Sequence, residues 1–520
     1  MTASIVWGVA KWQGTGFWSR DRRFESCRPS PWVRAGTREV DSVAEVVTEK
    51  PMFQRESAPI FAAVLAAGKG TRMKSNRAKV LHTICGVPMV NYVISALEPV
   101  GPERTLVVIG HQADEVKAVL PSGVAPVLQE EQRGTGDAVR VALKAIDDEE
   151  GILLVVNGDG PLISGKTLAG LVERHRSAGV GATVLVAELE DATGLGRVTE
   201  DAGVVRIVEE QDATEAEKRI NLVNLGLYAF ELSEIRQALG LVGTDNSQGE
   251  LYLTDVLEII GRKSRAVTHR VENLEEANLV NDRAHLAKAE EIVRRRILDE
   301  HMRRGVTVRD PVSTHIEAAV EIGRDTVILP GTFLRGETKI GSDCVIGPST
   351  DLSDTVVGDG ALVEHSVGRG AAVGPGASVG PYAYLRPETV LGEASKVGAY
   401  CEVKNTKVGA KSKVPHLSYV GDAEIGEGVN LGAGTITANY DGKNKHRTTI
   451  EDGVFIGINT NLIAPVTIGE DAYVGAGSVV NKDIPPGKLA VGMPARVIRD
   501  APKDEAKEGE AGDGKKGRDG

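Results

Sequence analysis

A glycine-rich turn near the start of the first apolar region carries side chains that suit phosphate binding. Residues 60–65 are apolar, and residues 65–73 then read LAAGKGTRM. Small residues let the backbone approach a nucleotide, its N–H groups can face phosphate oxygens, and Arg72 adds a planar cation. Lys79 supplies a second cation downstream. The glycine spacing fits neither the dinucleotide fingerprint nor the Walker loop, so both of those sites are disfavoured.

A second group of reactive and charged side chains interrupts a stretch that is otherwise aliphatic and small. Its members are Arg386, Glu402, Lys404, His416, Tyr419, Asn430, Asn439, Tyr440 and Lys445. The walls of a β-helix need no histidine, lysine or tyrosine, so these interruptions mark a second candidate site.

The stretch around this second site has a period of six residues. Aliphatic residues recur at every sixth position in several runs between residues 322 and 480, the clearest being Val367, Val373, Val379, Leu385, Leu391, Val397 and Val403. A period of six fits neither a helix nor a two-residue alternation. It predicts a left-handed parallel β-helix of hexapeptide repeats, with one aliphatic residue of each hexad pointing inward and small residues at the corners.

The first site lies in a different kind of fold. Apolar strands are expected at residues 60–65, 105–109 and 152–156, separated by segments of helical length. This alternation predicts a Rossmann-like α/β domain with a parallel sheet and ligands at the carboxyl ends of its strands. We expect the α/β domain over residues 52–285, a linker helix over 286–304, the all-β solenoid over 305–500 and a disordered tail over 501–520.

Residues 1–51 differ from the rest of the chain. They contain all four tryptophans, and residues 22–29 resemble the translated end of a tRNA gene. We therefore expect a non-native extension, with translation starting at or near Met52. The alternative is a genuine interaction arm rich in tryptophan and arginine.

Composition excludes several classes of protein. The 520 residues carry a net charge of -12, which argues against a general nucleic-acid binder. The four cysteines have neither metal-ligand spacing nor the look of a disulfide framework, as expected in a reducing cytoplasm. No apolar run approaches the roughly 18 residues of a membrane span, so we expect no stable membrane insertion.

Both halves resemble a known family through motifs that occur in the family's order. In the first half these are LAAGKGTRM with its downstream KVL and the segments at residues 129–136, 157–159, 196–197, 207–209, 248–250, 254–255 and 280–282. In the second half they are LRP, EVK, HLSYVGD, NLGAG and NYDGKNK. The first set resembles the sugar-1-phosphate pyrophosphorylases. Both sets together resemble the bifunctional GlmU family, which joins an N-acetylglucosamine-1-phosphate uridylyltransferase to a glucosamine-1-phosphate N-acetyltransferase.

The resemblance implies roles for residues of the first half. Arg72 and Lys79 would hold the triphosphate of UTP, and Asp159 with Asn281 would coordinate Mg²⁺, a hard cation that prefers oxygen ligands. The implied UTP and UDP-sugar contacts are Leu65, Ala66, Gly68, Gly70, Arg72, Lys79, Gln129, Gly134, Thr135, Gly196, Glu209 and Asn224. The attacking sugar phosphate is already an anion, so this reaction needs charge neutralisation and in-line alignment rather than a general base.

The resemblance also implies roles in the second half. His416 would be the general base that takes a proton from the sugar ammonium, with Glu402 as its orienting partner. The implied sugar-phosphate site consists of Arg386, Lys404, Tyr419, Asn430, Asn439, Tyr440 and Lys445, and the implied acetyl-CoA contacts are Ala433, Ala476 and Arg496. Related solenoids are homotrimers with active sites between subunits, so a homotrimer is expected.

Five positions near these sites depart from the family pattern. Ala78 replaces a proline, Gly160 a valine, Leu195 a tyrosine, Leu225 a serine or threonine, and Ile458 a serine. Leu225 stands beside Asn224 and is the departure of most concern for sugar affinity. None of the five removes a proposed charge or metal ligand, so we expect an active enzyme.

The leading hypothesis is a bifunctional transferase that makes UDP-N-acetylglucosamine for cell-wall peptidoglycan, and hence for cell shape. One alternative is a monofunctional nucleotidyltransferase whose β-helix only assembles subunits, and another is a non-catalytic scaffold. His416 with Lys404 and Arg386 favours the leading hypothesis over the monofunctional one. Asp159 with Asn281 argues against a scaffold, which would have no reason to keep a metal pair.

Overall fold

A computed structural model describes residues 58–244 and 246–501. The predicted extension over residues 1–51 therefore lies outside the described part of the chain, as does the predicted tail after residue 501.

The first domain is built on a nine-stranded sheet with β11-β7-β10-β6-β1-β4-β5 as its main order. Its strands are β1 Ile60–Leu65, β4 Arg104–Ile109, β5 Val124–Leu128, β6 Ile152–Asn157, β7 Ala182–Glu188, β8 Arg197–Asp201, β9 Val204–Val208, β10 Leu222–Glu231 and β11 Ala266–Arg270. The neighbours β6, β1, β4 and β5 run parallel, whereas β10 is antiparallel to both β6 and β7. This arrangement confirms the predicted α/β class. A small antiparallel hairpin, β2 Thr83–Ile84 and β3 Val87–Pro88, stands apart.

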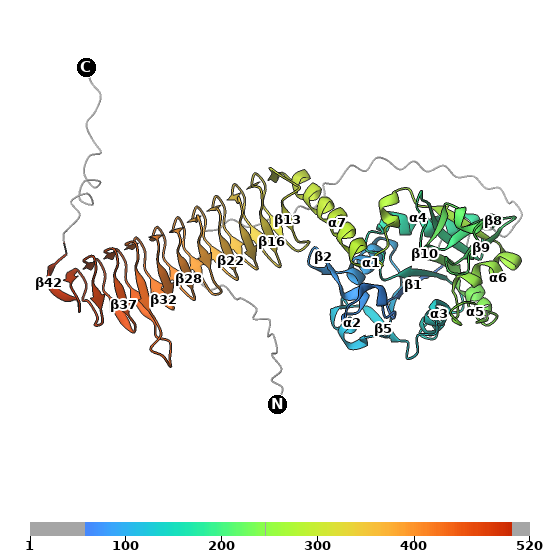
Figure 1. Ribbon diagram of the computed structural model, residues 1–520, viewed down its shortest axis with the longest axis horizontal. Coiled ribbons are helices and arrows are strands. Elements are labelled where there is room, and N and C mark those ends of the chain that lie inside the picture. The colour runs from blue at the N-terminus through green and yellow to red at the C-terminus, as the bar shows by residue number, and fades with distance from the viewer. Residues whose placement is uncertain (1–57, 245, 502–520) are drawn as a thin grey trace, which may run out of the picture. The chain divides into compact units, whose positions relative to one another are not determined.

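Helices cover both faces of this sheet because β1 and β6 are apolar on both sides. The helices are α1 Met89–Leu97, α2 Ala113–Val119, α3 Thr135–Leu143, α4 Gly165–Ala178, α5 Leu232–Leu239 and α6 Thr254–Ser264. Ala62 and Val64 of β1 share a core cluster with α1 and α4, while Phe61 and Ala63 share another with α3, α5 and α6. Figure 1 shows β1 and β10 between α4 and α3.

The linker helix α7, Arg283–Arg303, begins before the predicted start at residue 286. Asp282 explains the difference, because its carboxylate accepts hydrogen bonds from the backbone N–H groups of Ala284 and His285, both at 2.9 Å. An aspartate at this position satisfies amide groups that have no partner within the helix.

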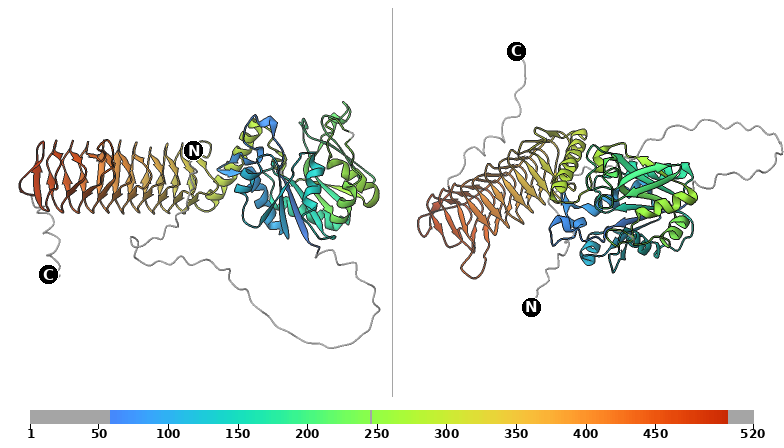
Figure 2. Two further views of the ribbon diagram at one scale, coloured as in Figure 1. Left: turned by 90° about the horizontal axis from the view of Figure 1, so that it is seen from below. Right: turned by 45° about the vertical axis from the view of Figure 1, so that its right-hand side comes forward.

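The second domain is a β-helix whose strands form three parallel sheets, drawn as stacked coils in Figures 1 and 2. The first sheet contains β12 Thr307–Val308, β15 Val327–Ile328, β18 Val345–Ile346, β21 Leu362–Val363, β24 Ser378–Val379, β27 Lys396–Ala399, β30 Lys413–His416, β33 Asn430–Leu431, β36 Phe455–Ile456, β39 Tyr473–Val474, β41 Lys488–Val491 and the antiparallel β42 Arg496–Asp500. The second contains β13 His315–Ile316, β16 Phe333–Arg335, β19 Asp351–Ser353, β22 Val367–Arg369, β25 Tyr384–Leu385, β28 Glu402–Lys404, β31 Tyr419–Gly421, β34 Ile436–Ala438, β37 Asn461–Ile463 and β40 Val479–Val480. The third contains β14 Glu321–Ile322, β17 Lys339–Ile340, β20 Val356–Val357, β23 Ala372–Val373, β26 Val390–Leu391, β29 Lys407–Val408, β32 Ala423–Ile425, β35 Thr448–Ile450 and β38 Val466–Ile468.

The six-residue period locates the core of this solenoid with one error. Most of the predicted inward residues are buried, from Val373 at 3% exposed to Val403 at 0%. Val367 is 37% exposed, and Gly368 occupies the inward position instead. The step from Gly368 to the next inward residue, Val373, has five residues instead of six, so counting back six from Val373 gives Val367, one residue too early.

Two corners of each coil matter for the second candidate site. The first corner joins a first-sheet strand to a second-sheet strand, as between β30 and β31, and the second corner joins a second-sheet strand to a third-sheet strand. Buried hydroxyl groups satisfy carbonyl oxygens at the corners: Thr332 donates to the Leu329 carbonyl at 2.7 Å and Ser366 to the Glu364 carbonyl at 2.6 Å. Cys401 occupies such a position, with its sulfur 3.2 Å from the Val414 carbonyl.

Candidate functional site

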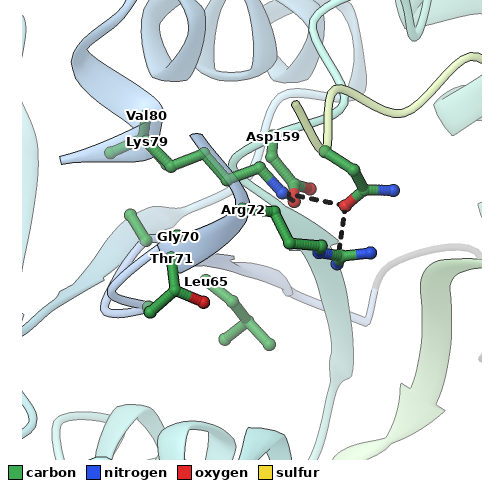
Figure 3. Close-up of a pocket in the computed structure, with 10 residues that line it drawn as sticks. Leu65, Gly70, Thr71, Arg72, Lys79, Val80 and Asp159 are labelled. Atoms are coloured by element: carbon green, nitrogen blue, oxygen red, sulfur yellow. Dashed lines mark hydrogen bonds and ion pairs between the residues drawn. The ribbon is translucent and has the colours of Figure 1, made fainter. Parts of the chain in front are cut away.

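A cavity of about 260 Å³ lies at the carboxyl ends of β1 and β6, where ligands of parallel sheets are expected. It is lined by Leu65, Ala66, Gly68, Gly70, Thr71, Arg72, Lys79, Val80, Asp159 and Asn281 (Figure 3). All but Thr71 and Val80 were predicted site residues, so the structure brings the glycine-rich turn, both cations and both metal-ligand candidates together.

Local backbone geometry explains why these residues meet. Gly70 has φ +57°, and a Cβ there would lie 2.5 Å from the Cβ of Lys79, so only glycine allows this close approach. The backbone N–H of Val280 donates to the Asp159 carbonyl at 3.1 Å, which fixes the next residue, Asn281, beside Asp159.

The ammonium group of Lys79 lies against the carboxylate of Asp159 (Figure 3). The Lys79 ammonium is 2.5 Å from Asp159 Oδ2 and 3.1 Å from Asn281 Oδ1, while Arg72 donates to Asn281 Oδ1 at 2.9 Å. Asp159 Oδ1 is buried and has no hydrogen-bond partner among residues 58–244 and 246–501. A carboxylate and an amide oxygen, one carboxylate oxygen being unsatisfied, fit the donor set of a magnesium site.

Gln129 and Thr135, two of the residues implied for UTP binding, contact other residues of the protein. Gln129 is buried and donates to Asp137 Oδ2 at 2.8 Å, and the Thr135 hydroxyl accepts the backbone N–H of Leu253 at 3.0 Å. Burial of Asp137 opposes its ionisation, but hydrogen bonds from Gln129 and Arg140 lower its pKa below the ordinary value. Sequence reasoning missed Asp137, which directly follows the motif at residues 129–136, because its contact with Gln129 is visible only in the structure.

Gly196, Glu209 and Asn224, three of the expected UDP-sugar contacts, lie close together. A Cβ on Gly196 would lie 3.5 Å from the Glu209 carboxylate and 3.7 Å from the Asn224 Cβ. Burial, followed by repulsion from Asp212 and Asp255, raises the pKa of Glu209. A further residue, Tyr228, was not predicted: its hydroxyl accepts a hydrogen bond from Asn224 Nδ2 at 2.7 Å.

The departure of most concern, Leu225, lies in the protein core. It is fully buried and belongs to the same apolar cluster as Val223 and Leu227, with Leu195 packed against it. The pairing of β10 with β7 shifts register between Asn224 and Tyr228, and such a bulge changes the direction in which side chains point. Leucine at 225 therefore fills the core here.

Two other departures also have local explanations. The backbone N–H of Ala78 donates to Gln112 Oε1, a hydrogen bond that the proline usual in the family could not make. A Cβ on Gly160 would lie 3.3 Å from Leu279 Cδ2, so Leu279 would have to shift slightly to admit the usual valine.

The second candidate site begins beside β25 and β28 of the second sheet. Arg386 donates to Glu402 Oε1 at 2.8 Å, so the partner of Glu402 in this chain is an arginine. Lys404 lies near Lys445, and the close approach of the Lys445 ammonium, with burial, lowers the pKa of Lys404. Three cations therefore gather here, as a sugar phosphate requires.

A buried carboxylate missed by the sequence reasoning holds this site together. Asp422 is 7% exposed and accepts hydrogen bonds from Asn405 at 2.6 Å and Asn439 at 2.5 Å. Burial opposes its ionisation, but these two amides and the charges of Lys404 and Lys445 lower its pKa. The sequence signal was available, since Asp422 is the last residue of the HLSYVGD motif.

The long loop between β34 and β35 carries Tyr440 and Lys445, which form an antiparallel bridge. Asp441 accepts hydrogen bonds from the backbone N–H groups of Lys443 at 2.8 Å and Asn444 at 2.7 Å, and its carboxylate contacts the His446 ring. These bonds give the loop a defined shape, as a substrate-positioning element needs.

His416 lies at the first corner, in line with the proposed acetyl-CoA residues. Its carbonyl accepts the N–H of Gly434, the Ala433 carbonyl accepts that of Asn459, and the Ile458 carbonyl accepts that of Gly477. His416, Ala433, Ile458 and Ala476 therefore occupy equivalent positions in successive coils. Ile458 is 54% exposed, and Arg496 is an exposed residue at the start of β42.

A single chain does not unite every proposed residue of the second site. His416 is exposed at the first corner, whereas Lys404 and Asn439 lie at second corners. Within residues 58–501 no hydrogen bond joins His416 to Glu402, and Asn430 pairs with Lys413 and Phe455 on the first sheet.

Among the helices of the described residues, none is both long and apolar enough to cross a bilayer. Cys85, Cys344 and Cys401 are buried free thiols, and burial, with the nearby charge of Glu290, raises the pKa of Cys85 to about 12.

Each half of the chain matches the model of a known protein family. Residues 62–217 match the MobA-like NTP transferase domain, and residues 447–482 match the bacterial transferase hexapeptide repeats. A solved UDP-glucose pyrophosphorylase complexed with UDP-glucose covers 46% of this chain and 99% of its own length at 17% identity, with a TM-score of 0.39, too low to support any argument.

The curated relatives match almost the whole of their own length. A protein of Rubrobacter xylanophilus named Bifunctional protein GlmU is 80% identical over 87% of this chain and 97% of its own length. A protein of the same name from Brevibacillus brevis is 49% identical over 84% of this chain and 96% of its own length. This chain therefore belongs to the family of bifunctional GlmU proteins.

Proposed function

We propose that the chain catalyses two consecutive steps of amino-sugar nucleotide synthesis. Acetyl-CoA first acetylates the amine of glucosamine-1-phosphate, and UTP then transfers its uridylyl group to N-acetylglucosamine-1-phosphate with release of pyrophosphate. The observation that carries the proposal is the convergence of Arg72, Lys79, Asp159 and Asn281 on one cavity. The monofunctional alternative is not favoured, since the full-length relatives are named as bifunctional.

In uridylyl transfer the sugar-phosphate oxygen attacks the α-phosphorus of UTP, and the bond to the pyrophosphate oxygen breaks. Arg72 and Lys79 bind and orient the triphosphate, and the backbone around Gly68 and Gly70 admits it closely. Asp159 and Asn281 would hold Mg²⁺, which neutralises charge on the phosphates when it is bound. Gln129 with its partner Asp137 supports recognition of the uracil.

In acetyl transfer the sugar nitrogen forms a bond to the thioester carbonyl carbon, and the carbon–sulfur bond breaks. The sugar ammonium loses one proton to solvent, and His416 accepts the second proton that the nitrogen loses and returns it to the departing thiolate, so the products are the amide, free CoA and one proton. Arg386, Lys404 and Lys445 bind the sugar phosphate. Ala433 and Ala476 line the corner along which the thioester arm approaches His416.

We propose that the protein is a homotrimer in which a neighbouring copy completes the acetyltransferase site. The first corner next to His416 presents an apolar ladder of exposed residues: Tyr382 at 54%, Tyr400 at 62% and Leu417 at 63%. The rings of Tyr382 and Tyr400 stack at 5.2 Å. Such a surface continues to the proposed base, so covering it with a second copy would also bring new residues to His416.

Replacing both Tyr382 and Tyr400 with aspartate should shift the mass in light scattering from a trimer to a monomer. The same change should reduce CoA release while leaving uridylyl transfer intact. A monodisperse monomer for the unaltered chain would refute the trimer proposal.

We propose a cytoplasmic enzyme whose product supplies cell-wall peptidoglycan precursors and thereby supports cell shape. Buried, unbridged thiols at Cys85, Cys344 and Cys401 support a reducing compartment.

Two half-reactions measured on one preparation test the proposed function. The first is CoA release from acetyl-CoA with glucosamine-1-phosphate, and the second is pyrophosphate release from UTP with N-acetylglucosamine-1-phosphate. His416→Ala should abolish only the first, and Asp159→Ala only the second. No CoA release from the unaltered protein would refute bifunctionality, and loss of both activities in either variant would refute two separate sites.

A further inference from the structure

The ammonium group of Lys79 lies where a metal ion would sit between Asp159 and Asn281. It contacts Asp159 Oδ2 at 2.5 Å and Asn281 Oδ1 at 3.1 Å, the two oxygens assigned to metal coordination (Figure 3). The Lys79 side chain is only 11% exposed and that of Asp159 25%. The ammonium of Lys79 therefore already supplies a positive charge to these two oxygen atoms.

The protein alone offers few further metal ligands at this place. Across the described residues, no group of three or more His, Cys, Asp or Glu side chains could hold a metal ion. Magnesium prefers six oxygen ligands and is commonly held by one or two carboxylates with water and substrate phosphates. With only Asp159 and Asn281 available, the remaining ligands must come from water and a triphosphate.

We propose that Lys79 acts as an internal substitute cation that occupies the metal position until a nucleoside triphosphate arrives. The triphosphate draws the ammonium away from Asp159 and supplies the missing oxygen ligands, so nucleotide and metal enter as a pair. This inference rests on the proposed uridylyltransferase site and adds a positioning role for Lys79 to its phosphate-binding role.

The placement of Lys79 makes such an exchange physically reasonable. Its Cβ is packed close to Gly70, so the base of the side chain is held in position. The ammonium end lies on four flexible carbon–carbon bonds and can change partner by rotation without movement of the backbone. The exchange also leaves Asp159 with a cation at every stage, which avoids an uncompensated, partly buried carboxylate.

The proposal predicts a measurable effect on metal affinity in the absence of nucleotide. An ion binds only to those molecules in which the ammonium has withdrawn, so its apparent dissociation constant increases by the inverse of that fraction. If the ion pair is closed in about nine-tenths of the molecules, removing the ammonium should strengthen metal binding about tenfold.

The test is a titration of the full-length protein with Mn²⁺, following free ion by electron paramagnetic resonance without nucleotide. Lys79→Met keeps the length of the side chain and removes the ammonium, and it should bind Mn²⁺ about tenfold more tightly than the unaltered protein. Lys69→Met is the matched control, because Lys69 is an exposed lysine on the same turn. It removes the same charge without opening the metal position, so its affinity should change far less.

The double variant Lys79→Met with Asp159→Asn should lose the gain in affinity, since the freed ligand is then absent. Equal affinities for the Lys79→Met variant and the unaltered protein would overturn the proposal. Equal gains in Lys79→Met and Lys69→Met would also overturn it, because they would indicate a general effect of charge.

A second measurement separates failure of this proposal from failure of the metal site itself. With UTP present, water proton relaxation reports Mn²⁺ held in the protein–nucleotide complex, and Asp159→Asn should remove that signal. Loss of the signal with no gain in Lys79→Met would leave the metal site standing and refute the substitute cation. Retention of the signal in Asp159→Asn would refute the metal site and the inference together.

Discussion

Asn439 donates a hydrogen bond of 2.5 Å to the carboxylate of Asp422, which lies in the preceding coil. The other carboxylate oxygen accepts Asn405 at 2.6 Å. Asp422 thus joins three successive coils and fixes the amide that is proposed to position the sugar or the developing oxyanion. Its charge also interacts with those of Lys404 and Lys445.

Asp422→Asn should lower acetyl transfer about tenfold to a hundredfold, because the Asn439 amide loses its charged acceptor and moves. Pyrophosphate release in the uridylyl half-reaction should not change. Asp452→Asn is the matched control, since Asp452 accepts a backbone N–H from Glu427 at 2.7 Å outside the proposed site. Full CoA release by Asp422→Asn would show that Asp422 has no part in positioning Asn439.

The lowered pKa of Lys404 predicts a pH dependence of sugar-phosphate binding. A lysine with a lowered pKa loses its charge at a lower pH than an ordinary lysine, so affinity should decline early on the alkaline side. Lys445→Met removes the main cause of the shift and should move this decline to higher pH, even if overall affinity falls. Calorimetric titration with N-acetylglucosamine-1-phosphate, which has no amine of its own, measures the profile.

Lys413→Met, which alters a lysine on the first sheet, should leave that profile where it is. An alkaline decline at the same pH in the Lys445→Met variant would contradict the assigned cause.

Gly70→Ala should lower uridylyl transfer about a hundredfold, because the added Cβ would displace Lys79 and the φ of +57° disfavours alanine. CoA release should be unaffected. Gly243→Ala adds the same atom where no other atom lies within 4 Å, and it should retain both activities. Normal pyrophosphate release by Gly70→Ala would show that the turn tolerates a side chain and that the close approach is unimportant.

Cys401→Ser should change stability by less than about 1 kcal/mol, since Ser418 occupies the equivalent corner position and donates to the carbonyl two residues before it, as Cys401 does to Ala399. Cys401→Leu should cost about 1–3 kcal/mol because it overfills a closely packed corner. Thermal unfolding followed by circular dichroism measures both variants. A serine variant that is as unstable as the leucine variant would argue against the hydroxyl-like role of this thiol.

The six-residue period predicted most of the solenoid core because each inward position is a local property of its hexad. It failed at Val367 because the length of a coil is decided by how strands pair, and Gly368 pairs with Leu352. The first-half site was predictable, since Lys79 and Asp159 lie in contiguous motifs beside strand ends.

Residues that act through a neighbour were harder to predict. Asp137, Tyr228 and Asp422 contact proposed site residues, and their importance depends on distances that no spacing in the sequence encodes. Glu402 was predicted to orient His416, but within this chain its carboxylate accepts a hydrogen bond from Arg386.

The spacing of the coils sets the distances between the aligned residues His416, Ala433, Ile458 and Ala476 at the first corner. Neighbouring strands of a sheet are about 4.8 Å apart, so three steps place Ala476 roughly 14 Å from His416 along the stack. The distance that an extended thioester donor spans along this corner is therefore a whole number of coil spacings. Adding or deleting one coil would lengthen or shorten the reach by a full step, a fixed increment that a flexible loop could not provide.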